Sequence, residues 1–326
     1  MSRHLVTGCA GFIGSHLCEA LVADGHVVVG VDAFTDYYDR DVKERNINAL
    51  RDADAFELVE ADLVEADLDE LLTGCDGVFH LAAQPGVRGS FGATFARYTR
   101  DNILATQRVF EATAAAGVRA VWASSSSIYG DAATHPTPEG TRPAPISPYG
   151  VTKLTCEHLA GAYAVSAGLD AVAMRYFTVY GPRQRPDMAF TRILRTLTTG
   201  GTFRVFGTGT QSRDVTYVAD AVAATIAAME LGVPGAAYNV GGGSETSLAE
   251  AIALCERLAG RTLDLVHEPV ATGDVRRTSA DTSRAAGDLE WAPRMDLEEG
   301  LQNHLAWAAA TYADDIARGR GPSVDA

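Results

Sequence analysis

The stretch "VTGCAGFIGSH", residues 6–16, places three glycines at the junction of a predicted strand and a predicted helix. Gly8 would let the chain turn tightly, Gly11 would let the backbone approach a pyrophosphate, and Gly14 would let helix and strand pack closely. The amino terminus of the helix, predicted over 12–23, would offer N–H groups and a positive dipole to phosphates. Because glycine-rich turns are common, the motif indicates a dinucleotide site only together with its neighbours in the chain.

The second predicted strand supports such a site. "HVVVGVD", residues 26–32, ends in Asp32, at about the 20-residue distance at which the dinucleotide fingerprint places an acid. A carboxylate there accepts hydrogen bonds from the adenosine ribose hydroxyls and repels a 2′-phosphate, so the sequence predicts NAD rather than NADP. The simpler alternative is that Asp32 caps or solvates a loop.

Strand-like and helix-like segments alternate through the first half of the chain. Short apolar runs predict strands at 4–8, 26–32, 56–62, 77–83, 120–126 and 170–177, and helical patterns lie at 12–23, 102–116 and 148–166. Such alternation is typical of a parallel sheet with helices on both faces, whose strands are apolar throughout. The sequence therefore predicts an α/β fold, a Rossmann-type doubly wound parallel sheet.

Beyond residue 177 the composition shifts to loops rich in Gly, Pro and Arg, which suit a polar ligand. Helices at 247–259 and 297–317 and a strand at 263–267 follow. We expect a smaller, partly interleaved α/β substrate domain that closes over the carboxyl ends of the strands. The expected division is 1–176 plus about 214–240 for the dinucleotide-binding domain, 177–213 and 241–317 for the substrate domain, and 318–326 for a frayed tail.

The composition disfavours several classes of function. The 326 residues carry a net charge of −15, which argues against a nucleic-acid or anionic membrane partner. The five cysteines form no CxxC pair, which favours a reduced, cytoplasmic protein over a disulfide or zinc framework, and we expect no metal. We expect no signal peptide, because the chain passes straight into a strand, and no membrane span, because no apolar run reaches about 20 residues.

"SPYGVTK", residues 147–153, places Tyr149 and Lys153 four residues apart in a predicted helix, so both side chains lie on one face. An ammonium near a phenol favours the phenolate, which makes the tyrosine usable as a base. A Tyr-x-x-x-Lys pair alone is common. Combined with the G-x-x-G-x-x-G turn, it resembles the extended branch of the short-chain dehydrogenase/reductase superfamily.

"WASSSSIYGD", residues 122–131, ends the fifth predicted strand with four serines. The carboxyl ends of the strands face the crevice where a nicotinamide would lie, so a hydroxyl there could hydrogen-bond the substrate oxygen that the tyrosine deprotonates. The superfamily's usual register, four residues before the Tyr of a YG pair, gives Ser125, and Ser126 is the next candidate. The alternative is that the serines only end the strand and bond the loop backbone, which we prefer for Ser124 and Ser127.

From about residue 3 to residue 307 the chain resembles the extended short-chain dehydrogenases that act on nucleotide sugars, and most of all the UDP-glucuronic acid 4-epimerases. The resemblance is carried by "VDAFTDYYD", "HLAAQPGVR", "SSSSIYG", "RYFTVYGPRQRPDMAF", "SRDVTYVAD" and "GDVRRTSAD". It implies an enzyme that keeps NAD bound, oxidises C4 of a UDP-sugar while Tyr149 takes the hydroxyl proton, and returns the hydride after the 4-keto sugar has turned. It also implies a homodimer joined through the helices at 102–116 and 148–166.

The same resemblance implies which residues contact the two ligands. Lys153 would bind the nicotinamide ribose, and Arg213 would grip the diphosphate, with a surface ion pair to Asp214 as the alternative. Beyond the residues already named, the cofactor would contact Phe12, Ile13, Asp62, Leu63, Leu81, Ala82, Ala83, Gln84, Asn102 and Phe177. The UDP-sugar would contact Ser126, Met188, Ala189, Phe190, Val205, Phe206, Arg213 and Asp274.

Two positions bear on a uronate carboxylate. Thr178 stands where hexose 4-epimerases of this branch usually have Asn, and its hydroxyl and backbone could bind a carboxylate. Arg185 could supply the positive charge, in two parallel hydrogen bonds. The alternative for Arg185 is a solvated loop cation, and Arg88 is a weaker candidate for the same role.

Departures from neighbouring families narrow the function. Related decarboxylases and dehydratases carry an acid just before a Val-Tyr-Gly, whereas this chain has Ser126, Ser127 and Ile128, which disfavours those reactions. Three residues before Asp274, many hexose epimerases carry Arg, and this chain has Ala271. The alternatives that stay open are a UDP-glucose 4-epimerase, a UDP-glucuronate decarboxylase and a non-enzymatic NAD-sensing protein, although such sensors typically lose the tyrosine or lysine.

Overall fold

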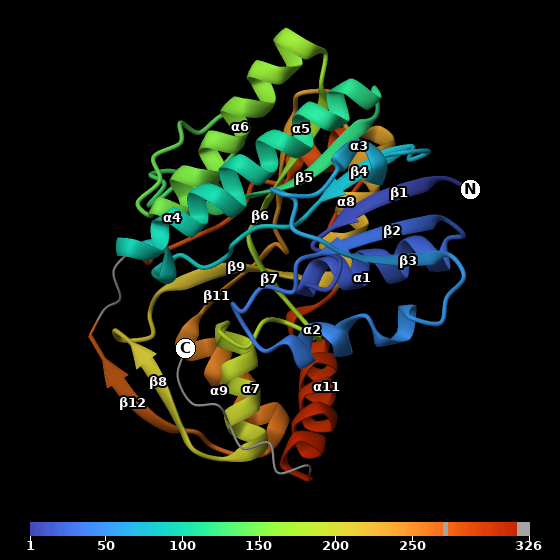
Figure 1. Ribbon diagram of the computed structural model, residues 1–326. Coiled ribbons are helices and arrows are strands. Elements are labelled where there is room, and N and C mark those ends of the chain that lie inside the picture. The colour runs from blue at the N-terminus through green and yellow to red at the C-terminus, as the bar shows by residue number, and fades with distance from the viewer. Residues whose placement is uncertain (270–272, 318–326) are drawn as a thin grey trace.

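A computed structural model of the protein describes residues 1–269 and 273–317, so that Ala271 and the expected tail at 318–326 lie outside the described residues. The centre of the fold is a seven-stranded parallel sheet with the strand order β10-β6-β5-β4-β1-β2-β3 (Figure 1). Its strands are β1 (Arg3–Thr7), β2 (Val27–Asp32), β3 (Phe56–Glu60), β4 (Gly77–His80), β5 (Arg119–Ser125), β6 (Asp170–Tyr176) and β10 (Ala237–Val240). The six strands predicted for this sheet are present, and β10 is a further strand beside β6.

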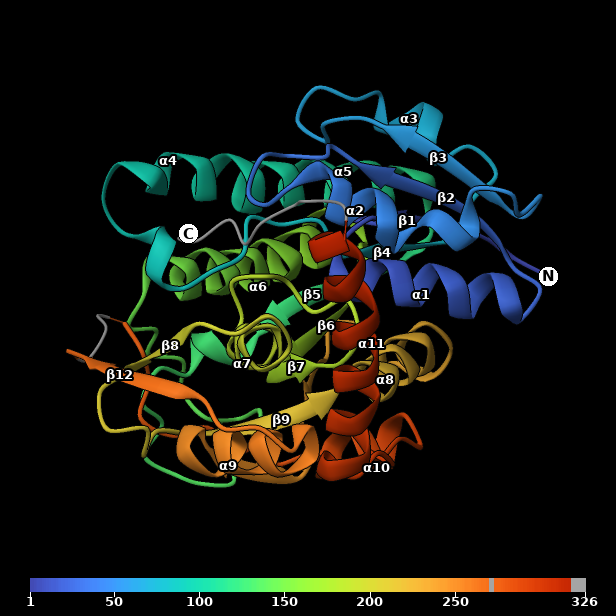
Figure 2. The same ribbon diagram turned by 90° about the horizontal axis from the view of Figure 1, so that it is seen from below.

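Helices cover both faces of this sheet. One face carries α3 (Leu68–Leu71), α5 (Ala105–Ala116) and α6 (Pro148–Ala167), and the other carries α1 (Phe12–Ala23) and α8 (Val218–Leu231) (Figure 1, Figure 2). Successive residues of β5 alternate between two apolar cores: Ala120 and Trp122 belong to one, and Val121 to the other. Burial on both faces explains the uniformly apolar strands and confirms the doubly wound Rossmann-type fold.

The helix predicted over 102–116 has a different start in the structure. α4 (Phe95–Tyr98), a π-helical turn η4 (Thr99–Leu104) and α5 follow one another without a gap. Thr94 occupies the N-cap position of α4 but does not cap it, because its hydroxyl donates to the carbonyl oxygens of Gly89 and Phe91. The predicted start, Asn102, therefore lies inside the π turn.

The chain beyond residue 177 builds two smaller sheets. A three-stranded sheet contains β7 (Thr178–Tyr180), β9 (Ser212–Tyr217) and β11 (Ser244–Ser247), and a two-stranded parallel sheet contains β8 (Thr202–Phe206) and β12 (Asp264–Glu268). The expectation of loops before residue 214 was wrong for β7, β8 and β9. These strands are short and partly polar, so they lack the long apolar run by which the central strands are recognised.

Four helices accompany the smaller sheets. They are α7 (Ala189–Thr199), α9 (Leu248–Ala259), α10 (Ser283–Asp288) and α11 (Leu297–Ala317). α9, α11 and β12 confirm the predicted elements, and Ser247 and Glu250 form a capping box at the start of α9. Between β2 and β3 lie the short helix α2 (Arg40–Asn46) and the 3-10 turn η1 (Asn48–Leu50). The other 3-10 turns among the described residues are η2 (Arg88–Ser90), η3 (Gly92–Thr94) and η5 (Ser126–Ile128). In the described part of the chain, no helix is long and apolar enough to span a membrane.

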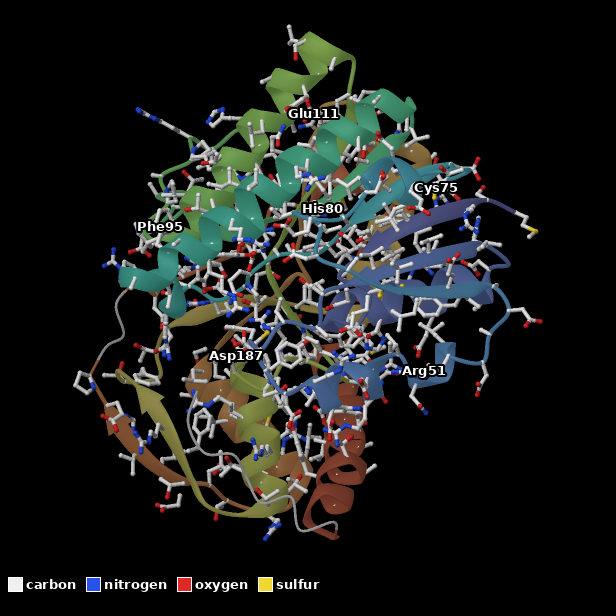
Figure 3. The ribbon with its side chains drawn as sticks, in the orientation of Figure 1. Arg51, Cys75, His80, Phe95, Glu111 and Asp187 are labelled. Carbon is white, nitrogen blue, oxygen red and sulfur yellow. The ribbon has the colours of Figure 1, made fainter. Side chains whose placement is uncertain are left out.

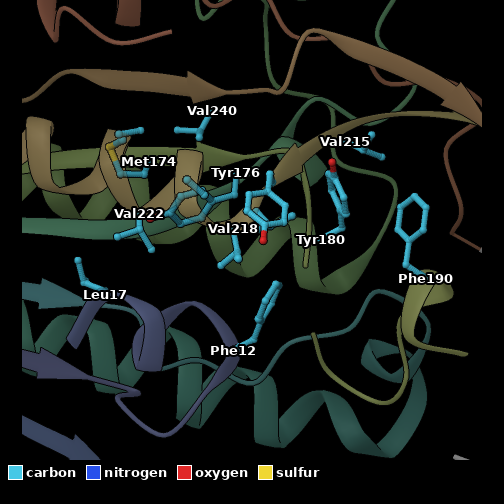
Figure 4. Packing of buried hydrophobic residues seen from close by; sticks show 14 of the residues in the cluster. Phe12, Leu17, Met174, Tyr176, Tyr180, Phe190, Val215, Val218, Val222 and Val240 are labelled. Atoms are coloured by element: carbon cyan, nitrogen blue, oxygen red, sulfur yellow. The ribbon is translucent and has the colours of Figure 1, made fainter. Parts of the chain in front are cut away.

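One apolar core joins the large sheet to the smaller part of the molecule (Figure 4). Phe12 of α1 and Tyr176 of β6 share it with Tyr180 of β7 and Phe190 of α7. The rings of Tyr180 and Phe190 are tilted, with centroids 5.3 Å apart. The region before and after residue 177 is therefore packed through a continuous core, which fixes β7 beside the end of β6.

The close packing of α1 on β1 can be tested with a pair of helical glycines. A Cβ on Gly14 would lie 2.1 Å from the carbonyl oxygen of Gly8, whereas a Cβ on Gly161 of α6 would meet nothing within 4 Å. We expect Gly14→Ala to lower the free energy of unfolding by about 1–3 kcal/mol through overpacking. Gly161→Ala should raise it by about 0.5–1 kcal/mol. Urea unfolding without NAD measures both, and equal stabilities for the two variants would contradict the packing argument.

Candidate active site

A cavity of about 410 Å³ opens where the central strands end. It is bordered by the glycine turn, the loops after β2, β3, β4 and β5, the start of α6, and the segment that follows β6. The predicted residues that line it are Gly8, Gly11, Phe12, Ile13, Gly14, Asp32, Asp62, Leu63, Leu81, Ala82, Ala83, Gln84, Ser125, Ser126, Tyr149, Lys153, Phe177, Thr178, Arg185 and Met188. Most of the predicted cofactor residues and the predicted catalytic residues thus meet in one cavity.

The glycine turn has the shape that a diphosphate needs. Gly8 has a φ of +72°, and a Cβ there would lie 2.8 Å from the backbone nitrogen of Ala82. α1 begins after Gly11 without a side-chain cap, so its first-turn N–H groups are left for a ligand in the cavity that Phe12 and Ile13 line. These residues fit the phosphates of a dinucleotide.

Asp32 lies at the cavity wall, 9% exposed. Its Oδ1 accepts a hydrogen bond from the backbone of Phe34 at 2.8 Å and lies 3.5 Å from Lys43 Nζ, while its Oδ2 accepts from the backbone of Ala10 at 3.2 Å. The carboxylate therefore orders the surrounding loops, as the simpler alternative expected, and it also borders the cavity. Lys43 is buried beside it and was not predicted as a site residue.

The proposed tyrosine base and its lysine are held at the start of α6. Ser147 caps this helix by accepting from the N–H of Gly150 at 3.1 Å, and Pro148 occupies the first turn. Lys153 is buried, and its Nζ donates to the carbonyl oxygen of Ala123 at 2.7 Å. Tyr149 is partly exposed in the cavity, so its hydroxyl is accessible to a ligand.

All four serines after β5 border the cavity, but their hydroxyls differ in partners. Ser125 Oγ accepts from the N–H of Ser127 at 3.1 Å, which leaves its own proton for another acceptor. Ser124 Oγ donates to Glu157 Oε1 at 2.6 Å, a side-chain partner instead of the loop backbone that we expected. The structure therefore brings Ser125 and Ser126 to the cavity with Tyr149.

Arg185 is paired, which corrects the alternative of a solvated cation. Its Nε and Nη2 donate to the two carboxylate oxygens of Asp187 at 3.0 and 3.1 Å, and Tyr37 Oη donates to Asp187 at 3.2 Å. Burial raises the pKa of Asp187, but Arg185 and Tyr37 lower it more, so it lies below its usual range. Asp187 and Tyr37 were missed as site residues, although "VDAFTDYYD" and "RPDM" both belong to the quoted segments.

A second group of predicted residues lies outside the cavity lining. Arg88 Nη2 pairs with Asp274 Oδ2 at 2.6 Å, and its guanidinium lies 4.2 Å from the centre of the Phe206 ring. Arg213 Nη1 donates to the carbonyl of Ser212 at 2.8 Å, and burial lowers the pKa of this guanidinium. Among the described residues, no carboxylate lies within ion-pair distance of Arg213.

The alternative partner for Arg213 was wrong. Asp214 is buried, and its carboxylate accepts from the N–H groups of Gly242 and Ala280 at 2.8 and 2.9 Å. Successive residues of a strand point to opposite faces, which separates the side chains of Arg213 and Asp214. The guanidinium of Arg213 is thus left available for an anionic ligand.

Four more predicted residues do not line the cavity. Asn102 is buried in the π turn, donates to the carbonyl of Gln84 and to Thr152, and accepts from the N–H of Gln84 at 2.6 Å. It therefore anchors the cavity residue Gln84. The side chains of Phe190 and Val205 pack in the core, and Ala189 is exposed.

A buried histidine beneath Lys153 provides a pH test. His80 contacts Thr7 Oγ1 at 2.7 Å and Thr106 Oγ1 at 3.0 Å, and burial, followed by the charge of Lys153, lowers its pKa from 6.5 to about 3 (Figure 3). The unfolded chain takes up this proton below pH 6.5 and the folded chain does not, so the free energy of unfolding falls as the pH falls towards 3.

The free energy of unfolding should decrease between pH 6.5 and pH 5, and we expect this decrease to be about 2 kcal/mol smaller in His80→Gln than in the wild type. Urea unfolding at the two pH values measures it, with His158→Gln, an exposed histidine of α6, as the matched control. An unchanged acid dependence in His80→Gln would contradict a neutral buried His80.

Known proteins resemble this chain over nearly its whole length. The UDP-glucuronate 4-epimerase of Thermodesulfobacterium geofontis is 36% identical over 314 residues, which are 94% of this chain and 96% of that protein. A Bacillus subtilis protein named uncharacterized UDP-glucose epimerase YtcB is 42% identical over 313 residues, 94% of this chain and 98% of its own length. The crystal structure of a Bacillus cereus UDP-glucuronic acid 4-epimerase with UDP-glucuronic acid and NAD superimposes with a TM-score of 0.93 at 39% identity, covering 95% of this chain and 100% of that one.

A family model also matches this chain. Residues 4–241 match the family model described as the NAD dependent epimerase/dehydratase family. The match spans the glycine turn, the serine turn and α6, which are the elements that surround the cavity. The chain is a member of the NAD dependent epimerase/dehydratase family.

Proposed function

We propose that this protein interconverts UDP-glucuronate and UDP-galacturonate by inverting C4 of the sugar, with NAD retained throughout the cycle. The observation that carries the proposal is the meeting, in one cavity, of a dinucleotide turn, a Tyr149–Lys153 pair, a serine turn and Arg185 with Thr178. The first three elements serve oxidation and reduction at a carbinol carbon. The last pair suits a substrate that carries a carboxylate.

The residues of the chain move one proton at the C4 oxygen. Tyr149 takes the hydroxyl proton as C4 becomes a carbonyl, and it gives the proton back after the keto sugar has turned over in the cavity. Lys153, fixed by its bond to Ala123, would hold a positive charge on the same face of α6 as Tyr149. Ser125 donates to the C4 oxygen, with Ser126 as the next candidate. Bound NAD would supply the chemistry of hydride acceptance and return.

The uronate carboxylate would be bound by Thr178 and Arg185. The bidentate pair with Asp187 uses Nε and Nη2 of Arg185, so Nη1 is left to donate to a second carboxylate. A charge-assisted bond of this kind contributes about 1.5–3 kcal/mol. Asp187 and Tyr37 hold the guanidinium in place at the cavity edge.

The smaller sheets would bind the nucleotide. Arg213, with no carboxylate at ion-pair distance among the described residues, would bind the diphosphate. The charges of Asp274 and Arg88, which form an ion pair beside the Phe206 ring, act on its guanidinium. We propose residues 177–213 and 241–317 as the substrate domain and residues 1–176 with about 214–240 as the NAD domain.

A second candidate is 4-epimerisation of UDP-glucose. The name of the Bacillus subtilis relative favours it, and so does the pairing of Arg185, because Asp187 offsets the charge that a uronate needs. A decarboxylase is disfavoured, since Ser126 and Ser127 stand in the cavity where an acid would move the extra proton.

We also propose a homodimer through α5 and α6, in the cytoplasm. Leu104 and Val151 are 43% and 44% exposed on this helical layer, and Phe95 lies at its far end with 37% exposure (Figure 3). Exposed apolar side chains on two adjacent helices suit a second copy of the same surface. The cytoplasmic location is supported by five buried cysteines that form no disulfide among the described residues.

The proposed reaction predicts a product without added cofactor. Purified protein incubated with UDP-glucuronate alone should yield UDP-galacturonate until the two nucleotide sugars are nearly equal in abundance. Chromatography of the nucleotide sugars measures this ratio. Tyr149→Phe should lower kcat by about 10²–10⁴-fold, because the base is lost. Tyr163→Phe, further along α6 and outside the cavity lining, is the control and should retain activity. Recovery of only UDP-pentose and carbon dioxide would show a decarboxylase instead.

Arg185 separates the two sugar substrates. We expect Arg185→Leu to raise KM for UDP-glucuronate by about 10–100-fold, from the loss of a charge-assisted bond, and to leave turnover of UDP-glucose nearly unchanged. Arg183→Leu is the matched control, because Arg183 pairs with Glu19 at 2.7 Å instead of lining the cavity. If Arg185→Leu affects both substrates equally, Arg185 does not recognise the carboxylate.

A further inference from the structure

A buried ion pair lies behind the serine turn. Arg175 of β6 donates from Nη2 and Nε to the two carboxylate oxygens of Glu157 on α6, at 2.8 and 2.9 Å. The two side chains are only 9% and 14% exposed. Neither residue has a role in the chemistry described above, and a buried pair is by itself weak evidence for stability, because apolar residues of similar volume often replace such pairs without loss.

The pair is tied to both ends of the serine turn. On one side, Ser124 Oγ donates to Glu157 Oε1 at 2.6 Å. On the other, Arg175 Nη1 donates at 2.7 Å to the hydroxyl of Tyr129, the residue that follows η5. Tyr129 in turn donates to Asn239 Oδ1 at 2.7 Å. The turn that carries Ser125 and Ser126 is thus bracketed by one buried network.

The same network fixes α6 along β5. Tyr149, Lys153 and Glu157 are spaced by four residues, so they lie along one face of α6. Lys153 bonds the backbone of Ala123, and Glu157 bonds the next residue of the strand, Ser124. The helix therefore hydrogen-bonds two successive residues of β5 at the end of the strand that borders the cavity.

Strand register explains why Arg175 reaches this point. In the parallel pairing of β5 with β6, Ser124 lies opposite Arg175. Neighbouring residues in register present their side chains on the same face of a sheet, here the face covered by α6. Glu157 is therefore shared by two adjacent strands, and its loss would loosen the helix against both.

We propose that Glu157 is a positioning residue: through Ser124 and Arg175 it holds the serine turn and the Tyr149–Lys153 face of α6 at a fixed relative position. In its kinetic part the proposal rests on the proposed epimerase function. A displacement of about 1 Å between a base and its substrate costs about 10²-fold in rate. Glu157 would thus act on kcat, while it touches neither ligand.

The test compares two carboxylates that join the same pair of strands. Glu157→Gln removes the negative charge of the carboxylate beside the cavity. Asp170→Asn removes the negative charge of a carboxylate that pairs with Arg119 at 2.9 Å, at the amino-terminal ends of β5 and β6, away from the cavity. Ser124→Ala is a milder second variant that leaves the Glu157–Arg175 pair intact. Hydrogen–deuterium exchange of the peptide over 124–129 is measured without substrate, and kcat and KM are measured with UDP-glucuronate.

We expect Glu157→Gln to speed exchange in 124–129 and to lower kcat by about 10²-fold, with KM within about threefold of wild type. Ser124→Ala should show the same two effects at smaller size, and it decides the matter if Glu157→Gln does not fold. Asp170→Asn should show neither. Unchanged exchange in 124–129, or equal losses in Asp170→Asn, would overturn the proposal. If the wild type fails to convert UDP-glucuronate, the proposed function fails and exchange alone decides the positioning.

Discussion

The bonds between α6 and the end of β5 are the constraint on which the site depends. Lys153 donates to the carbonyl of Ala123, and Glu157 accepts from Ser124, so the helix cannot slide along the strand without breaking a buried bond. Breaking such a bond costs about 1–3 kcal/mol, because the group left behind is buried and unsatisfied. The tyrosine at the start of α6 and the serines at the end of β5 therefore reach the cavity as one unit.

Charge at the site is arranged locally against a net charge of −15. In the proposed reaction, the N–H groups at the start of α1, the guanidinium of Arg213 and Nη1 of Arg185 would each bind an anionic group of a ligand. Asp187 offsets the positive charge of Arg185. Discrimination of a uronate from a hexose would therefore depend on the geometry of the hydrogen bond from Arg185 more than on net electrostatic attraction.

Much of the fold and of the cofactor site could be predicted from the sequence, because both are local. Gly8, Gly11 and Gly14 form a turn within one strand–helix unit, and Tyr149 and Lys153 share a helix face. The parallel sheet then brings these units together at one edge, since the carboxyl ends of its strands converge.

Contacts between distant segments could not be predicted in the same way. The partners of Arg185 and Arg88, and the core positions of Phe190 and Val205, depend on how the short strands β7, β8 and β9 pack, and their partly polar sequences resemble loops. Asn102 hydrogen-bonds the backbone of Gln84, a contact between separate segments that no local sequence pattern indicates. Only the folded chain shows that Ser124 and Tyr129 share the Glu157–Arg175 pair.

In the proposed reaction the hydrogen of C4 leaves and returns within one cavity, while a single tyrosine moves the hydroxyl proton. The most direct measurement uses UDP-glucuronate deuterated at C4 in ordinary water, with nuclear magnetic resonance of the UDP-galacturonate formed. Deuterium fully retained at C4 of the product is the expected result. Replacement of that deuterium by solvent hydrogen would contradict the claim.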